Sequence, residues 1–508
     1  MRRYWLIGIF VTSITQAQQS ALQQSLNFED VRAASFYYQN ITGAASQTIT
    51  LAEIRILENN YNEALSILRS NKHYYVTPEL EGQFWLLSAV ALHKNQLFKQ
   101  SDEAFNNALK LFNKTDEKII WLAQYQYWKT LVLLERNRLD ESAHAAHAAL
   151  RFYNQDSTTN YIKKAKLLLW LGGVKKGQDQ LDSAKIYLLR SLSLFQNSPL
   201  DKNLEIVKVY NNLANVYAKE WSYIKAKDYY EKSIKLNEEK IRNYNELVFA
   251  CSNFAVFYSD FENQIKAEYW FDQAMQWMKK SPLDPIRSAQ LLQNYGSALT
   301  KQFEIEKAID IFKQALQLIE PWKQDREDIY SQILINMATS YALLNQLDKI
   351  EPIDNALSQI AEVLKSKWPD QDKRYLLWRI QKSEIEGKFL QALELIYQIE
   401  QTFTHSTLTD YKIEVLEYKA TCLNNLRRYS ESLPVYKQVY QYHLNNKPIT
   451  HSLVISTLNN IGSVFFYQNQ NDSASFYLNQ AKTNNLLPLD TVLSEESRFS
   501  SKIEWIVS

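Results

Sequence analysis

The chain has 508 residues, with 57 basic and 56 acidic side chains but only 9 glycines and 10 prolines. Glycine and proline together are roughly a third as frequent as in ordinary proteins, which leaves little turn material for a sheet-rich fold and favours an all-helical one. A formal net charge of +1 gives no reason to expect nucleic-acid binding, because such binding needs clustered lysine and arginine. The length indicates several domains or one long array of repeats.

The first seventeen residues have the pattern of a secretory signal peptide. Residues 1–3 are Met-Arg-Arg, an apolar run extends from Tyr4 to Val11, and the small residues Thr15 and Ala17 precede the expected cleavage point. An apolar stretch of about eleven residues is too short to span a bilayer, which needs roughly twenty. We therefore expect cleavage after Ala17 and export to the periplasm or out of the cell.

Residues 18–48 contain the segment FEDVRAASFYY and are expected to form an N-terminal capping helix. The clearest repeat follows at residues 210–236, where Leu213, Ala214 and Tyr217 share one side of a first helix. Ala226, Tyr230 and Ser233 share one side of a second helix. The same six positions recur in the next two units at a constant step, as Phe254, Ala255, Tyr258, Ala267, Phe271 and Ala274, and then as Tyr295, Gly296, Leu299, Ala308, Phe312 and Ala315.

One position of the first helix marks about eleven such units between residues 49 and 488. These marker positions follow one another at intervals of about 40 residues, and they are Ala52, Ala89, Leu131, Gly172, Ala214, Ala255, Gly296, Ala338, Ile380, Ala420 and Gly462. Small side chains let two helix backbones approach closely, and aromatic side chains fill the remaining space. One helix pair cannot bury its apolar stripe alone, so neighbouring pairs must stack into a continuous core.

Residues 489–508 follow the last unit and carry Val492, Phe499, Ile503 and Ile506. These four residues would form the apolar stripe of a C-terminal capping helix, whose polar outer face would keep the stack soluble. The alternative is that the segment is the tail of a truncated or split gene.

The repeated pattern of Leu-Ala or Leu-Gly with Tyr, followed by Ala, an aromatic residue and Ala, resembles the tetratricopeptide repeat family over about residues 50–485. The resemblance implies an all-α, right-handed superhelical solenoid of stacked antiparallel helix pairs. It is weak at Leu131, at Ile380 and around Ala338. The period exceeds the family's usual one by about one turn per helix, as in long-period exported bacterial proteins of this type. A HEAT or armadillo solenoid, with a period of roughly 40 to 47 residues, is the competing fold.

The sequence contains none of the common catalytic, phosphate-binding or metal-binding motifs, namely GxxxxGK[ST], GxGxxG, HExxH, GxSxG and CxxC. His144 and His147 share a helix face, but two ligands are too few for a zinc site. His147 occupies the aromatic core position of its unit, so packing is the favoured interpretation. Cys251 and Cys422 are expected to be buried free thiols. We therefore expect no enzyme activity, no cofactor and no metal.

One column of polar residues stands out, just before the leucine or aromatic residue of the first helix. Five units have asparagine there: Asn212, Asn253, Asn294, Asn336 and Asn460. The family resemblance implies that this column, joined by Asn215, borders a concave groove where such amides bind a peptide backbone in some members. A carboxamide has one acceptor and two donors and so can pair with any extended peptide. The alternative is that these amides bond only to the neighbouring helix pair.

The sequence thus predicts an exported, non-enzymatic scaffold that binds a peptide or protein segment, with no nucleic-acid partner and no membrane span. The resemblance implies a docking or sensory part of an envelope signalling system, or the N-terminal repeat half of a split CHAT-peptidase or histidine-kinase type protein. Trp128, Trp170 and Trp378 lie near the same face, but we expect them to be packed. The other class of function left open is a small-ligand or glycan-binding solenoid, which needs a closed apolar pocket with inward polar groups.

Overall fold

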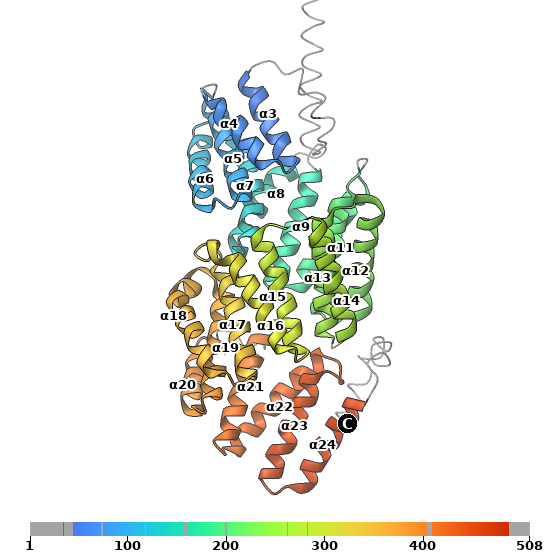
Figure 1. The fold of residues 1–508 in the computed structure, drawn as a ribbon. Helices are drawn as coiled ribbons and strands as arrows, with labels where there is room; N and C mark the ends of the chain where they lie inside the picture. Colours follow the sequence, from blue (N-terminus) through green and yellow to red (C-terminus); the bar gives the residue numbers. More distant parts are fainter. Residues whose placement is uncertain are drawn as a thin grey trace, which may run out of the picture. The chain divides into compact units, whose positions relative to one another are not determined.

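The computed structural model describes residues 34, 44–72, 75–116, 118–155, 161–198, 201–261, 263–281, 283–403 and 409–486. Every regular element in those ranges is a helix, and 22 α-helices follow one another as antiparallel pairs (Figure 1). The predicted all-α stack of helix pairs is therefore confirmed. The predicted signal peptide and C-terminal cap lie outside the described residues, as does most of the predicted N-terminal cap.

The helices divide between two compact units, which are described separately. Unit 1 consists of Met1–Val216 with Glu239–Ile241, and unit 2 consists of Tyr217–Glu238 with Arg242–Ser508. The helices that begin in unit 1 are α3 (Ala44–Leu57), α4 (Tyr61–Ser70), α5 (Pro78–Lys94), α6 (Phe98–Phe112), α7 (Lys118–Glu135), α8 (Leu139–Gln155), α9 (Tyr161–Gly177), α10 (Leu181–Gln196) and α11 (Asn203–Lys219), the last of which continues into unit 2.

Unit 2 contains six complete helix pairs and the second helix of the pair that α11 begins. Its α-helices are α12 (Tyr223–Leu236), α13 (Tyr244–Asp260), α14 (Gln264–Lys280), α15 (Pro285–Lys301), α16 (Ile305–Ile319), α17 (Glu327–Leu343), α18 (Ile350–Lys367), α19 (Pro369–Ile385), α20 (Phe389–Glu400), α21 (Asp410–Asn425), α22 (Tyr429–Asn446), α23 (Ser452–Tyr467) and α24 (Asn471–Leu486). Short helices extend or connect them: the π-helix η2 (Asn237–Ile241), which crosses the boundary between the units, and the 3-10 helices η3 (Glu320–Trp322) and η4 (Leu347–Lys349).

The eleven marker positions all lie on the first helix of a pair, and ten of them are buried. Close packing explains their small size. A Cβ atom added to Gly296 would lie 2.6 Å from Cε1 of Phe312, and one added to Gly172 would lie 2.5 Å from Cγ of Leu188. Real Cβ atoms do not approach other atoms so closely, so a larger residue at either position would force the facing side chain or the helices to shift.

The pair α7–α8 departs from the predicted register by one residue. Thr130, not Leu131, is fully buried, and the Ser142 hydroxyl donates to the Thr130 carbonyl at 2.9 Å. Ser101 makes the equivalent bond to the Ala89 carbonyl at 2.8 Å in the preceding pair. The shift places Ala146 in the core and leaves His147 exposed. The prediction that His147 is a packed core residue is therefore wrong.

The turns within the helix pairs have a repeated backbone geometry. In ten of the eleven, one described residue has a φ angle between 56° and 70°, in the left-handed region. Only Gly387 is a glycine. The other nine are Asn59, Gln96, Asn137, Asp179, Trp221, Phe303, Asn345, Arg427 and Asn469. A left-handed residue with a side chain costs about 1 kcal/mol. Because the chain has few glycines, nine of these turns carry that backbone strain.

The first helices of successive pairs contact one another, and this layer positions the candidate site. In unit 1 the contacts join α3, α5, α7 and α9, and in unit 2 they join α13, α15, α17, α19 and α21. Successive second helices make no comparable contacts in the described residues. We call the layer of first helices the first-helix face. No described helix has both the length and the apolar character needed to cross a bilayer.

Candidate functional site

The first-helix face of unit 2 carries uncharged polar side chains that bond to one another between α15 and α17. The Asn336 Nδ2 donates to Ser297 Oγ at 2.8 Å, and the Gln332 Nε2 donates to Asn336 Oδ1 at 3.2 Å. One turn further along, the hydroxyl oxygens of Thr300 and Ser340 lie 3.0 Å apart. The Asn336–Ser297 and Thr300–Ser340 contacts join α15 to α17, and the Gln332 bond holds the Asn336 amide within α17, so Asn336 stabilises the stack.

Asn212 has a similar structural role in unit 1. Its Nδ2 donates to the Lys208 carbonyl at 2.9 Å within α11, and its Oδ1 accepts from Lys176 Nζ of α9 at 3.1 Å. Donor and acceptor sides of the amide are thus both engaged. Asn215, one turn further along α11, is half-buried and also has an interaction partner.

The remaining asparagines of the column differ from these. Asn253 on α13 is half-buried and has an interaction partner. Asn294 on α15 is half-buried but makes no side-chain hydrogen bond to any described residue. Asn460 on α23 is exposed. The amide of Asn294 is therefore available for hydrogen bonds to a ligand.

Sequence reasoning found the asparagine column but not the hydroxyl groups that bond to it. Ser297 directly follows the marker Gly296, and Thr300 and Ser340 lie further along the same faces. The available signal was the recurrence of serine or threonine just after the marker, seen also at Thr339, Thr421 and Ser463. These side chains add uncharged polar groups to the first-helix face.

A carboxyl and a thiol meet on the same layer, between α19 and α21. Cys422 Sγ donates to Glu384 Oε1 at 3.2 Å. Burial raises the pKa of Glu384 to about 7, although the thiol hydrogen bond opposes the shift. Burial and the nearby Glu384 raise the pKa of Cys422, and burial raises that of Cys251 to about 12. Both cysteines are free and buried, as predicted, and their thiols stay protonated.

Replacing Glu384 with glutamine is expected to change how stability depends on pH. An unfolded carboxyl titrates near 4.5, whereas that of Glu384 titrates near 7 in the folded chain. Between these values the folded state binds more protons, so this group lowers stability as pH rises from about 4.5 to about 7. Thermal melts of Glu384→Gln should show a higher Tm than the parent at pH 8 and a smaller difference at pH 5. The same difference in Tm at pH 5 and pH 8 would contradict the raised pKa of Glu384.

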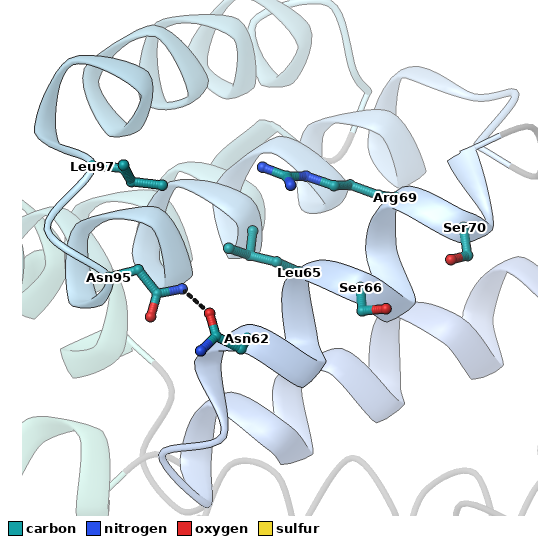
Figure 2. Close-up of a pocket in the computed structure, with 7 residues that line it drawn as sticks. All are labelled: Asn62, Leu65, Ser66, Arg69, Ser70, Asn95 and Leu97. Carbon is teal, nitrogen blue, oxygen red and sulfur yellow. Dashed lines mark hydrogen bonds between the residues drawn. The ribbon is translucent and has the colours of Figure 1, made fainter.

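A surface hollow of about 620 Å³ lies elsewhere, between α4 and the turn that follows α5 (Figure 2). Its lining residues are Asn62, Leu65, Ser66, Arg69, Ser70, Asn95 and Leu97. Asn95 Nδ2 donates to Asn62 Oδ1 at 2.9 Å across one end of the hollow. The exposed Arg69 guanidinium extends into it and makes no ion pair with a described residue. The hollow is open, and five of its seven side chains are polar.

The remaining sequence candidates are packing or surface residues. Trp378 is 1% exposed, and its Nε1 donates to Asp354 Oδ1 at 3.2 Å. Trp128 is also buried, and Trp170 packs on Tyr127 with ring centroids 4.9 Å apart. The predicted packing of these tryptophans is confirmed. In the part of the chain that the structure describes, no three His, Cys, Asp or Glu side chains are grouped to hold a metal ion.

Comparison with known proteins supports the repeat assignment. The family model described as Tetratricopeptide repeat matches residues 207–240 and 289–320. No curated protein matches the chain in sequence. These two segments thus match the tetratricopeptide repeat, and the described helix pairs form a tetratricopeptide-like solenoid.

Solved structures similar to this chain share its fold at low sequence identity. A Rap protein complexed with competence and sporulation factor is 14% identical, with a TM-score of 0.56, and the match covers 71% of this chain and 99% of that one. NprR in complex with its cognate peptide NprX is 12% identical, with a TM-score of 0.50 and coverages of 72% and 97%. The APC/C hetero-tetramer Cut9–Hcn1 is 13% identical, with a TM-score of 0.50 and coverages of 94% and 88%.

Proposed function

We propose that this chain is a non-enzymatic scaffold that binds an extended segment of another protein on the first-helix face of α13, α15 and α17. The observation that carries the proposal is the side chain of Asn294, which is half-buried and makes no hydrogen bond within the described residues. The neighbouring Asn336 and Ser297 are held in place by their mutual bond. Asn294 would therefore present its amide from a fixed polar surface.

The chemistry of this surface favours a peptide backbone over a charged side chain. The polar groups bonded between α15 and α17 are amides and hydroxyls, and none of them carries a charge. Backbone N–H and C=O groups are the complementary partners, and they are present in any extended segment. The similar Rap and NprR structures are complexes with competence and sporulation factor and with a cognate peptide, respectively, which supports the same use of the fold here.

We also propose that the scaffold is exported and acts in the cell envelope. The basic start and short apolar run of residues 1–17 support export, with the mature chain beginning after Ala17. In that setting the scaffold would act as a docking or sensory part of an envelope system. The small-ligand alternative has less support, because the hollow on α4 is open and lined mainly by polar side chains.

Replacing Asn294 with alanine is expected to weaken peptide binding without affecting folding. The probe is a peptide selected against the full chain from a random displayed library. Loss of one hydrogen bond of about 1 kcal/mol should lower the affinity roughly five- to tenfold. The Tm should not change, because the amide makes no hydrogen bond that the substitution removes. Isothermal titration and thermal melts check the two expectations.

Asn460 provides the matched control. It is an asparagine of the same column, but it is exposed and lies on α23, four pairs after α15. Asn460→Ala should leave the affinity for the selected peptide unchanged. Equal binding by the parent and Asn294→Ala would refute the proposed site, whereas a large fall in Tm would indicate that Asn294 has a structural role instead.

A further inference from the structure

The turns within the helix pairs of unit 2 expose large apolar side chains along one edge. The turn after α13 leads to Ile265, which is 84% exposed, and the turn after α15 contains Phe303, which is 81% exposed. Exposed apolar residues also lie at or beside the turns after α11, α17 and α19, namely Ile224, Leu343, Leu347 and Leu390. Single exposed apolar residues are common on protein surfaces, but a repeated series on one edge indicates contact with another segment.

Ile265 lies at the start of α14 and Phe303 in the turn after α15, and residues beside them bond to one another. Lys301 Nζ lies 2.8 Å from Asp260 Oδ1, and Gln302 Nε2 donates to Gln264 Oε1 at 3.5 Å. Ile265 directly follows Gln264, and Phe303 directly follows Gln302. We call Ile265 and Phe303 the apolar turn patch.

Turn geometry alone does not account for Phe303. Its φ angle is 61°, in the left-handed region that glycine and asparagine tolerate best. The equivalent position of the next pair is Asn345, with a φ angle of 56°. Phe303 thus combines backbone strain with a ring exposed to water. Such a combination is expected where the side chain has a contact outside the described residues.

At the turn after α11, which precedes the apolar turn patch along the same edge, Trp221 is covered by another part of the chain. It occupies the same turn position as Phe303, two repeats before it, with a φ angle of 57°. Its ring meets the ring of His451 edge-on with centroids 4.9 Å apart, and Lys447 Nζ lies 4.5 Å from its centroid. The connection between α22 and α23 therefore packs against the turn after α11. A late part of the chain already covers the first position of the edge.

The repeat period predicts which segment covers the next position. One repeat moves position 221 to 262 in the turn after α13, and the same step moves the partners at 447 and 451 to 488 and 492. These positions begin the segment that follows α24, which ends at Leu486. Residues 487–508 include Val492, Phe499 and Ile503. Burial of such side chains against Ile265 and Phe303 would be favourable, because it would remove apolar surface from water.

We propose that residues 487–508 of the same chain dock on the apolar turn patch and continue the contact that Lys447 and His451 make with Trp221. The proposal is independent of the peptide-binding face, because it concerns the turn edge and not the first helices. It also explains why an aromatic residue occupies a strained, otherwise exposed turn position.

The test uses the full chain at low concentration with the photo-crosslinking residue p-benzoylphenylalanine in place of Phe303. This position is exposed, so the replacement should not disturb folding. After irradiation, mass spectrometry should find a crosslink within one chain to residues 487–508. The same residue in place of Leu390, an exposed position three helix pairs after Ile265, should give no crosslink to that segment. Crosslinks to a second copy of the chain, or none to 487–508, would overturn the proposal.

Hydrogen exchange gives a second, independent measurement. In the full chain carrying both Ile265→Glu and Phe303→Glu, backbone amides of residues 487–508 should exchange faster than in the parent. The reason is that apolar side chains of this segment would not pack favourably against two charged glutamates. Exchange in α13 to α16 should not change. Unaltered exchange in the C-terminal segment would overturn the proposal.

Discussion

Replacing Asp328 with asparagine is expected to lower the free energy of unfolding by about 3 kcal/mol, the cost typical of breaking a buried ion pair. The two carboxylate oxygens of Asp328 accept from Arg326 Nε at 2.9 Å and from Arg326 Nη2 at 2.8 Å. Both residues are buried at the start of α17. The substitution keeps the shape of the side chain but leaves a buried guanidinium without its counter-charge. Denaturant unfolding of the two proteins measures the difference.

A double-mutant cycle separates the ion pair from other effects at this site. Arg326→Met removes the buried charge, so Arg326→Met combined with Asp328→Asn should be more stable than Asp328→Asn alone. If the double variant were as unstable as the sum of the two single variants, Asp328 would stabilise α17 through some contact other than Arg326.

Replacing Gly296 with alanine is expected to cost about 2 kcal/mol, within the usual range for overpacking a core. The added Cβ would lie 2.6 Å from Cε1 and 2.8 Å from Cζ of Phe312, so either the ring or the helices must shift. Alanine is the better helix former by about 1 kcal/mol, and the clash must exceed this gain. Denaturant unfolding at a fixed pH measures the net change.

Gly173 provides the matched control for that prediction. It also lies within a first helix, but the nearest atom to an added Cβ would be Leu134 Cδ2 at 3.8 Å, an ordinary contact. Gly173→Ala should therefore stabilise the chain by up to about 1 kcal/mol through helix propensity alone. If both substitutions stabilised the chain, the small marker residue would not be needed for close helix approach.

The sequence was sufficient to predict the helix pairs because each pair repeats the same packing requirement. Ala214, Ala255 and Gly296 are small for the same reason, and their spacing reveals the repeat directly. The register failed at Leu131, because the residue that fits the crossing is Thr130, and its role depends on a hydroxyl bond from Ser142. A pattern of apolar and small residues does not contain that information.

The candidate site could be predicted only in part. The asparagine column lies on first helices as expected, but the partners of its members are about one repeat away, at Lys176 and Ser297. Whether an amide bonds to the stack depends on such neighbours, whose side-chain directions the sequence does not give. The contact between Cys422 and Glu384, 38 residues apart, was missed for the same reason. The left-handed backbone conformation of Phe303 was also missed.

The most direct test of the proposed function is hydrogen exchange of the full chain with and without a peptide selected against it. Binding on the first-helix face predicts slower exchange in α13, α15 and α17, centred on the turn of α15 that contains Asn294. Protection confined to second helices, to the turn edge or to the hollow beside Arg69 would contradict this account.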